Sequence, residues 1–413
     1  MFSGIKPKKR AAVLVLLLQV FFVYGQFIPK DPVLFAKASE LAQKFIIVDG
    51  HVDLPYRLRV QNFRFVKEFT GIPIETHEGD FDFKRARQGG LDAPFMSIYI
   101  PASYQTNGGA AALADSLIEM VEYITTTHPD YFTIAKNPND VILAKKEGKI
   151  ALPMGMENGA PVEDDLRLVR HFKEKGISYI TLTHSKDNKI CDSSYDTTQT
   201  WKGISPYGFT LLDEMVRQGI MIDISHISDN ACHQVFDYVK VPVIASHSSV
   251  RKYTPGFERN ISDTLLLRLK KNGGVVMINF GTDFLDGEIS KFNNQKRNEL
   301  HQLLLEKKLD KNSEEGKKVI ADFTNKYPTL FSDVYMVADH IDHVVRLIGI
   351  EHVGLGSDYD GVGDSLPVGL KDVADYPNLL YVLLERGYAE ADIEAICYRN
   401  VFRVWNQVLE AAE

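Results

Sequence analysis

The stretch FIIVDGHVD, residues 45–53, begins as an apolar run and ends in a histidine and a carboxylate. Its apolar part is typical of a buried strand. Because alternate residues of a strand point to the same side, we expect His51 and Asp53 to project together from its carboxyl end. An imidazole beside a carboxylate is half of a metal site. A capped strand followed by an unrelated histidine fits the stretch equally well.

Seven similar runs follow along the chain. They are DAPFMSIYI at 92–100, IALPMGMENG at 150–159, ISYITLTHS at 177–185, IMIDISHIS at 220–228, VPVIASHSS at 241–249, GGVVMINF at 273–280 and HVGLGSDYDG at 352–361. Each is almost continuously apolar, as in strands that are buried on both faces of a parallel sheet. Amphipathic segments separate them. Eight strands alternating with helices predict an α/β fold of the (β/α)8 TIM-barrel type, although a doubly wound open sheet also fits.

The chain divides into three parts by composition. Residues 1–25 contain a basic N-terminal region, a short apolar run and a small residue at a suitable cleavage site, a pattern that predicts a signal peptide. Residues 26–413 are assigned to one barrel domain. Within it, the charged segment 286–328 predicts a helical insertion between the seventh and eighth strands, either a solvated pair of helices or a lid or oligomer contact.

Charge and cysteine content exclude several classes of function. Removal of the signal peptide changes the net charge from −8 to −12, and an acidic surface argues against nucleic acid and anionic membranes as partners. The three cysteines, Cys191, Cys232 and Cys397, form no C-x-x-C pair, which excludes a zinc ribbon and a dithiol redox motif. A disulfide between Cys191 and Cys232 stays open, but we expect buried, inert thiols.

Six of the eight predicted strands end in a side chain that could bind a metal or catalyse a reaction. These side chains are His51, Asp53, Glu157, His184, His226, His247, Asp358 and Asp360. Catalytic groups of such barrels come from the carboxyl ends of different strands, where these residues are expected. Because so many equivalent positions are hard to obtain by chance, we interpret the set as one active site. His340 and His343 are left out of it, because they are expected on the surface of the helix before the eighth strand.

The residue types in this set predict a zinc site. Imidazoles and carboxylates without thiolates suit Zn²⁺ or a similar divalent ion. Five ligands are too many for a single catalytic zinc with an open position. They suit two ions that share Glu157 as a bridge and hold a hydroxide, a strong nucleophile at neutral pH. The five are His51, Asp53, Glu157, His226 and His247.

Six motifs in this order resemble the membrane dipeptidase family, the renal dipeptidase-like zinc metallopeptidases with an amidohydrolase-type barrel. The motifs are DGHVDLP, MGMENG, YITLTHS, IDISHIS, IASHSS and VGLGSDYDG. The resemblance runs from about residue 45 to the C-terminus. It implies that His51 and Asp53 bind one zinc, that His226 and His247 bind the second, and that Glu157 bridges them.

The resemblance also implies roles for three residues that bind no metal. His184 contacts the substrate and donates to the developing oxyanion. Asp358 acts as the general acid and base. Arg259, in FERNISD, receives the terminal carboxylate of the substrate, which limits substrates to about two residues. Gly281 stands where the family often has an aromatic residue, which predicts a more open substrate pocket.

We therefore expect an exported dipeptidase with two zinc ions that hydrolyses free dipeptides. The alternative is another zinc-barrel hydrolase that acts on an amide, a lactone or a β-lactam. Arg259 distinguishes a dipeptidase from a lactonase, because a lactone offers no carboxylate for the arginine to bind. A barrel that binds peptides without hydrolysing them is a further alternative. The expected location is the periplasm or the extracellular space, with a bacterial envelope favoured and no membrane anchor after signal cleavage. The resemblance implies a homodimer.

Overall fold

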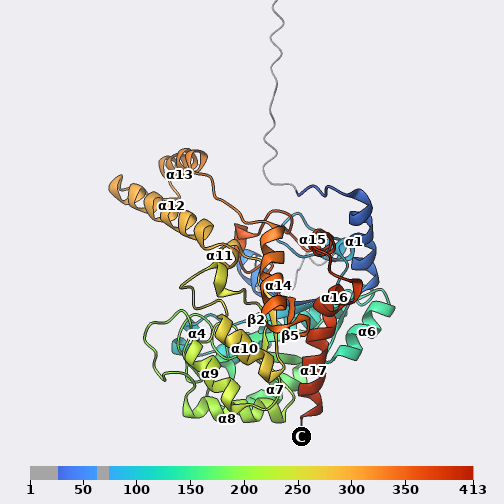
Figure 1. The fold of residues 1–413 in the computed structure, drawn as a ribbon. Helices are drawn as coiled ribbons and strands as arrows, with labels where there is room; N and C mark the ends of the chain where they lie inside the picture. Colours follow the sequence, from blue (N-terminus) through green and yellow to red (C-terminus); the bar gives the residue numbers. More distant parts are fainter. Residues whose placement is uncertain (1–26, 63–73, 413) are drawn as a thin grey trace, which may run out of the picture.

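The computed structural model describes residues 27–62 and 74–412, and its central feature is a closed parallel barrel (Figure 1). Around the barrel the strands are β1 (Ile47–Val52), β10 (Val353–Leu355), β9 (Val275–Ile278), β8 (Ile244–Ala245), β7 (Met221–Asp223), β6 (Ile177–Thr181), β5 (Met154–Glu157) and β2 (Leu91–Tyr99). Because β1 pairs with β2 on one side and with β10 on the other, the (β/α)8 prediction is confirmed and an open sheet is excluded. The predicted signal peptide lies outside the described residues.

Each of the eight predicted runs coincides with one barrel strand, although β2 begins one residue before its run. The third run, residues 150–159, divides at Pro153, which has no amide hydrogen to donate to a neighbouring strand. Its first part is β4 (Ile150–Leu152), which pairs with β3 (Phe132–Ile134) outside the barrel. Its second part contains β5, so only residues 154–157 of the predicted run form the barrel strand.

Large side chains fill the inside of the barrel. The ring of Phe95 lies 5.4 Å from the ring of Tyr179 and 5.1 Å from that of Trp405, measured between centroids. Gly155 leaves room for Tyr179, because a Cβ there would lie 1.9 Å from the phenol ring. Trp405 belongs to α17 (Asn400–Glu410), whose Arg403 donates to a carbonyl just before β9. Since α17 covers the amino-terminal ends of the strands, a ligand must bind at their carboxyl ends.

Helices surround the barrel, and several of them begin at a capping side chain. Ser205, Ser228 and Ser262 each accept a hydrogen bond from a backbone amide in the first turn of α8, α9 and α10. The helices are α1 (Pro32–Lys44), α2 (Leu54–Asn62), α3 (Phe83–Gly89), α4 (Ser103–Asn107), α5 (Ala110–Thr127), α6 (Pro138–Lys146), α7 (Arg167–Lys175), α8 (Pro206–Arg217), α9 (Asp229–Tyr238), α10 (Asp263–Asn272), α11 (Thr282–Leu285), α12 (Gly287–Glu306), α13 (Glu314–Lys326), α14 (Val334–Ile348), α15 (Tyr376–Glu385), α16 (Glu390–Glu394) and α17.

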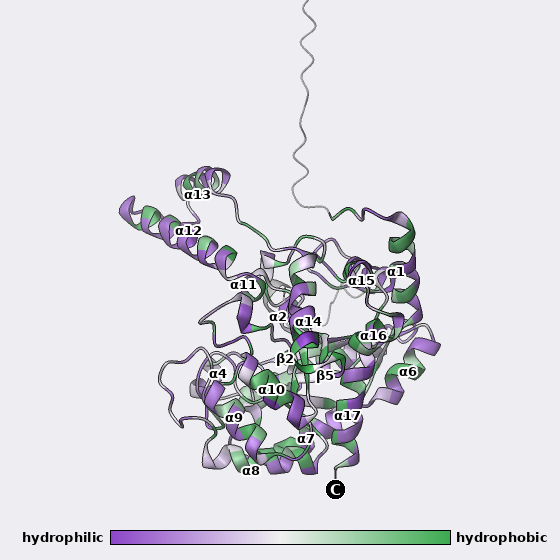
Figure 2. Cartoon of the chain, viewed as in Figure 1, coloured by the Kyte–Doolittle hydropathy of each residue, from purple (hydrophilic) through white to green (hydrophobic). Residues whose placement is uncertain are grey.

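Helices α12 and α13 project away from the barrel as a pair (Figure 1). They occupy the segment 286–328, which the sequence assigned to a helical insertion. Only Asn293 of α12 and Gly316 of α13 are buried. Figure 2 shows hydrophilic residues over much of both helices, so most of the pair faces solvent. Within residues 27–62 and 74–412, no helix combines the length and the apolar character that a membrane crossing requires.

Two histidines of α14 are buried. The sequence interpretation put His340 and His343 on the surface of this helix, and that expectation is wrong. The Nδ1 atom of His340 accepts a hydrogen bond from the Val250 amide at 3.0 Å, and its Nε2 donates to the Leu285 carbonyl at 2.9 Å. His343 pairs with Asp263 at 2.7 Å. Both rings have polar partners from segments that pack against α14, which is how a buried histidine is tolerated.

The three cysteines are buried and free, as the sequence predicted. Burial raises the pKa of each thiol, so none is activated as a nucleophile.

Candidate metal centre

Seven predicted site residues lie at the carboxyl ends of barrel strands. They are His51 and Asp53 at β1, Glu157 at β5, His184 after β6, His226 after β7, His247 after β8 and Asp358 after β10. Closure of the barrel brings these ends together. All seven residues except His184 are buried, so the set forms a polar cluster in a largely apolar interior.

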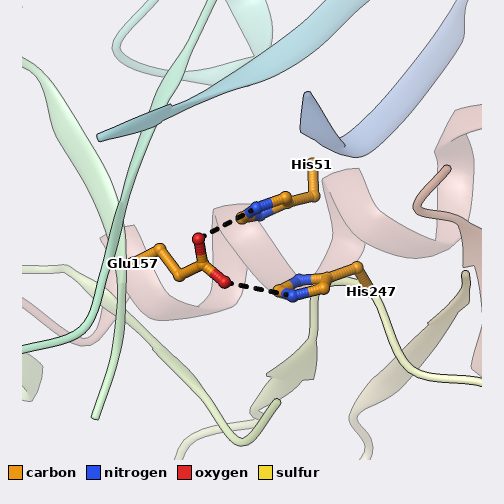
Figure 3. A group of neighbouring side chains, drawn as sticks. All are labelled: His51, Glu157 and His247. Carbon is orange, nitrogen blue, oxygen red and sulfur yellow. Dashed lines mark ion pairs between the residues drawn. The ribbon is translucent and has the colours of Figure 1, made fainter. Parts of the chain in front are cut away.

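The carboxylate of Glu157 lies at the centre of four imidazoles. Its Oε1 is 3.0 Å from the Nε2 of His226, 3.4 Å from that of His247 and 3.5 Å from that of His184. Its Oε2 is 3.4 Å from the Nε2 of His51. Figure 3 shows Glu157 reaching between His51 and His247, one on each carboxylate oxygen. A carboxylate in this position presents one oxygen to each side, as a bridge between two cations requires, and the Ser97 hydroxyl donates to Oε2 at 3.3 Å.

Asp53 and Asp358 also lie beside His51. The Nε2 of His51 is 3.4 Å from Oδ2 of Asp53. A Cβ at Gly361 would lie 2.1 Å from Oδ2 of Asp53 and 2.3 Å from Oδ1 of Asp358, so only glycine fits beside the two carboxylates. Asn279 donates to Oδ2 of Asp358 at 2.8 Å and fixes its orientation. Ligand atoms of His51, Asp53 and Asp358 lie within 4.8 Å of one another, which is compatible with a cation between them.

Several buried polar atoms of this cluster have no hydrogen-bond partner within the part of the chain that the structure describes. They are Nε2 of His51, Oδ1 of Asp53, Nδ1 of His184 and Nδ1 of His226. A buried polar atom without a partner costs free energy, and several in one place indicate a ligand. Because the donors are imidazoles and carboxylates, the site fits divalent metal ions such as Zn²⁺.

Neighbouring side chains fix which nitrogen of two imidazoles is free to bind a metal. Tyr179 donates its hydroxyl hydrogen to the Gly50 carbonyl at 3.0 Å, so its oxygen accepts from Nδ1 of His51 at 2.8 Å. Ser246 donates to Asp223 at 2.7 Å and accepts from Nδ1 of His247 at 2.7 Å. In both residues Nε2 therefore faces the cluster and is the nitrogen that a metal would bind.

Sequence reasoning missed these supporting residues. Asp223 stands in the quoted motif IDISHIS, but its partners are set by the neighbouring strand β8 and not by local sequence.

The electrostatics of the cluster favour cations. Burial and nearby positive charges lower the pKa values of His226 and His247 well below the usual range, which keeps both imidazoles in their neutral, metal-binding form. Burial opposes the charge of Glu157, but His51 and His184 outweigh it and hold its pKa well below its usual range. Burial also opposes protonation of His51, yet Tyr179, Glu157 and Asp53 raise its pKa well above usual. A metal ion competes with that proton for the same Nε2.

Two further groups have altered proton affinity. Burial raises the pKa of Asp358 to about 7, and the charges of Asp53 and Glu157 act in the same direction. Burial lowers the pKa of His184, so its imidazole is neutral near pH 7 and carries one N–H. His184 lies at the edge of the cluster, with its ring 4.8 Å from that of Tyr99. An acid or base and a neutral hydrogen-bond donor therefore stand beside the ligand cluster.

The cluster opens into a cavity of about 630 Å³, lined by Asp53, Glu157, His184, His226 and Asp358 among others. Arg259 does not line it. The Arg259 guanidinium is buried, donates to the Ser248 hydroxyl at 2.7 Å and to the His247 carbonyl at 2.9 Å, and leaves Nε without a partner. Its central carbon lies 5.3 Å from the ring of Phe284, which does line the cavity. Arg259 thus lies close to the cavity, next to one of its aromatic walls.

The predicted opening beside Gly281 is not found. A Cβ at Gly281 would lie 2.8 Å from Val362 and 3.0 Å from Phe284. These two side chains fill the space that a larger residue at this position would take, because the chain turns there into the short helix α11.

Asp360, at the end of the same strand as Asp358, pairs with an arginine and not with the ligand cluster. The Nε atom of Arg57 lies 2.8 Å from Oδ1 of Asp360, and both side chains are almost fully buried. Asp80 and Asp360 each accept a hydrogen bond from the other's backbone amide, at 2.7 and 2.8 Å. Both Asp358 and Asp360 have positive φ, 64° and 65°. The contacts of Asp360 hold this strained turn, and with it Asp358, in place.

Comparison with protein families and known proteins agrees with this geometry. The model of the membrane dipeptidase family, peptidase family M19, matches residues 35–413. An uncharacterized dipeptidase of Schizosaccharomyces pombe is 33% identical over 89% of this chain and 82% of its own length. Dipeptidase 3 of Mus musculus is 31% identical over 93% of this chain and 68% of its own.

Solved structures with the same fold include two bacterial proteins. The probable dipeptidase PvdM from Pseudomonas aeruginosa superposes with a TM-score of 0.76 at 23% identity, over 92% of this chain and 99% of its own. A metallo peptidase from Rhodobacter sphaeroides, liganded with a phosphinate mimic of the dipeptide L-Ala-D-Ala, gives a TM-score of 0.70 at 22% identity. It covers 88% of this chain and 99% of that protein. At these identities the likeness shows the barrel fold.

Proposed function

Because the chain belongs to the membrane dipeptidase family of metallopeptidases, peptidase family M19, we propose that it hydrolyses free dipeptides with two zinc ions at the carboxyl end of its barrel. The observation that carries this proposal is the position of Glu157, within 3.5 Å of four imidazoles. A carboxylate placed between ligands on both sides is suited to join two cations. The unpartnered buried nitrogens and oxygens around it support the same conclusion.

The ligands divide into two groups around Glu157. His51 and Asp53 would hold one ion, His226 and His247 the other, and Glu157 would contribute one oxygen to each. Such a pair of ions supplies Lewis acidity and a nucleophile from water at neutral pH. Tyr179 supports this assignment because it orients His51, as Ser246 orients His247.

Asp358 and His184 would carry the proton transfers and the charge of the reaction. Asp358 accepts the proton of the attacking water and passes it to the leaving amine, a task suited to a carboxyl with a pKa of about 7. Asn279 holds one of its oxygens, which leaves the other free for the proton. The neutral imidazole of His184 donates its N–H to the oxygen of the scissile carbonyl as negative charge develops there.

Arg259 would receive the terminal carboxylate of the dipeptide through its unpartnered Nε and the remaining hydrogens of its guanidinium. The test compares a dipeptide such as Gly-Leu with its C-terminal amide, in wild type and in Arg259→Ala. Losing one partner of a buried charge pair costs about 2–5 kcal/mol, so kcat/KM for the acid should fall by about 30- to 4,000-fold. The wild type should discriminate against the amide by a comparable factor, and the variant should lose most of that discrimination.

Arg268→Ala is the matched control, because Arg268 belongs to the next helix, α10, and pairs with Asp237 at the surface. That variant should keep the discrimination between acid and amide. Equal hydrolysis of acid and amide by the wild type would refute the role of Arg259.

A second candidate is a zinc-barrel hydrolase for another amide, a lactone or a β-lactam. It is favoured by one observation: Arg259 does not line the cavity, and both of its terminal nitrogens already donate to the protein. A wild type that hydrolyses a lactone or β-lactam faster than Gly-Leu would establish this alternative.

We also propose that the protein is exported, to the periplasm or the extracellular space, with a bacterial envelope favoured. The proposal rests on the sequence of residues 1–25. N-terminal sequencing of the mature protein tests it, and a first residue near Gln26 is expected. The homodimer that the family resemblance implies stays a prediction, which sedimentation equilibrium would test.

A further inference from the structure

A second cavity adjoins the one that holds the ligand cluster. It measures about 390 Å³, and three residues line both cavities: Tyr195, Asp283 and Phe284. We call it the side chamber. Its remaining lining comes from the loop after β8 and from the first turns of α12, the first helix of the projecting pair.

Aromatic rings form the inner surface of the side chamber. Phe257 lies between the other two rings, with its centroid 6.0 Å from that of Tyr195 and 5.7 Å from that of Phe284. Both contacts are edge-to-face, a geometry that leaves ring surface available to another aromatic group. On the opposite side, Ser290 and Asn294 of α12 form the outer surface. The chamber therefore combines an aromatic surface with polar groups, among them the charged side chains of Asp283 and Lys291. Apolar surface with a small number of polar groups is the usual character of a ligand site.

The side chamber lies next to the proposed carboxylate receptor. The guanidinium carbon of Arg259 is 5.3 Å from the ring of Phe284, and Phe284 lines both cavities. The C-terminal residue of a dipeptide carries its carboxylate and its side chain on the same carbon atom. With the carboxylate at Arg259, that side chain begins beside Phe284, which lines both cavities.

We propose that the side chamber binds the side chain of the C-terminal residue of the dipeptide and selects large aromatic ones, with α12 as its outer wall. The inference rests on the proposed function, because it assumes a dipeptide with its carboxylate at Arg259. The volume accommodates an indole, and three rings supply its contacts. The projecting helices thereby acquire a role in substrate selection.

The test compares kcat/KM for Gly-Trp, Gly-Gly and Trp-Gly. Burial of a large apolar side chain corresponds to about a 10- to 100-fold gain in kcat/KM, so the wild type should prefer Gly-Trp over Gly-Gly by that factor. Ser290→Trp places an indole in the chamber and should reduce this preference at least 10-fold. Asn298→Trp, farther along α12 and facing the groove toward α13, is the matched control and should keep it.

Phe257→Ala should also weaken the preference, because it removes the central ring. No preference for Gly-Trp in the wild type, or the same preference in Ser290→Trp, would overturn the proposal, as would a preference for Trp-Gly that Ser290→Trp abolishes. If the wild type hydrolyses no dipeptide, the proposed function fails. Calorimetric binding of Gly-Trp and Gly-Gly to the same proteins then decides on the chamber, and equal affinities overturn it.

Discussion

Replacing His340 with glutamine tests how a buried neutral imidazole limits stability in acid. His340 is fully buried in α14, and both of its ring nitrogens form hydrogen bonds with backbone groups, the Val250 amide and the Leu285 carbonyl. A proton on Nδ1 would break the first of these bonds and place a charge in an apolar region. Burial, with a smaller contribution from the nearby His343, lowers the pKa of His340 from 6.5 to about 4.

The direction of the effect follows from the two pKa values. Above pH 6.5 the imidazole is neutral in the folded and unfolded chains, and its ionisation does not affect stability. Between pH 6.5 and 4 only the unfolded chain binds the proton, so the free energy of unfolding falls as the pH falls. Because each pKa unit corresponds to 1.36 kcal/mol, this one residue should remove about 2 kcal/mol at pH 5 and about 3 kcal/mol at pH 4.

Urea unfolding of wild type and His340→Gln at pH 7.5, 5 and 4 measures this difference. Titratable groups that the two proteins share cancel in the comparison. The free energy of unfolding of the wild type minus that of the variant should therefore decrease, relative to pH 7.5, by about 2 kcal/mol at pH 5 and about 3 kcal/mol at pH 4. His301→Gln, at an exposed histidine of α12, controls for the loss of a histidine and should unfold like the wild type. A difference in free energy of unfolding between the two proteins that is independent of pH would refute the reasoning. An NMR titration of the His340 ring with a midpoint near pH 6.5 would refute it as well.

Three further predictions concern the metal centre and its support. Glu157→Gln should lower the metal content from two ions per chain and affect both sites together, measured by elemental analysis, because a neutral amide bridges poorly; loss of one ion alone would contradict a shared bridge. Asp358→Asn should retain the metal and reduce kcat by about 100-fold or more, the scale of a general acid or base, and loss of metal would instead identify Asp358 as a ligand. Arg57→Met should lower the free energy of unfolding by about 3–5 kcal/mol in thermal or urea unfolding, because it leaves the buried Asp360 carboxylate without its cationic partner. Arg57→Lys keeps the charge and should lose less stability. Equal losses in the two variants would show that the charge contributes little.

The barrel could be predicted from the sequence because its strands are buried on both faces. Such strands appear as continuous apolar runs, and a residue at the carboxyl end of each run must lie at the same end of the barrel. That argument placed His51, Glu157 and His247 in one site before any distance was known. It failed where a local feature was decisive, as at Pro153, which divides a single apolar run into β4 and β5.

Contacts between distant segments could not be predicted. The exchange of hydrogen bonds between Asp80 and Asp360 depends on how two loops meet, and no spacing in the sequence encodes it. His340 illustrates the same limit, because its partners come from two other segments and its polarity suggested an exposed position. The position of Arg259 behind Phe284 likewise depends on how the loop after β8 packs on α11. Sequence patterns indicate burial and periodicity, whereas contacts between distant segments depend on how the folded chain packs.

The pairing of β1 with β10 also determines the order in which the chain can fold. β1 is synthesised early, yet one of its edges finds its partner only when residues 353–355 have emerged from the ribosome. The apolar rings of Phe95 and Tyr179 stay uncovered for longer still, until Trp405 of α17 arrives. An open strand edge and an uncovered core are the surfaces on which nascent chains aggregate. Release of this chain before α17 is complete should therefore produce an insoluble product, and chaperones that shield long nascent chains should determine how much protein matures.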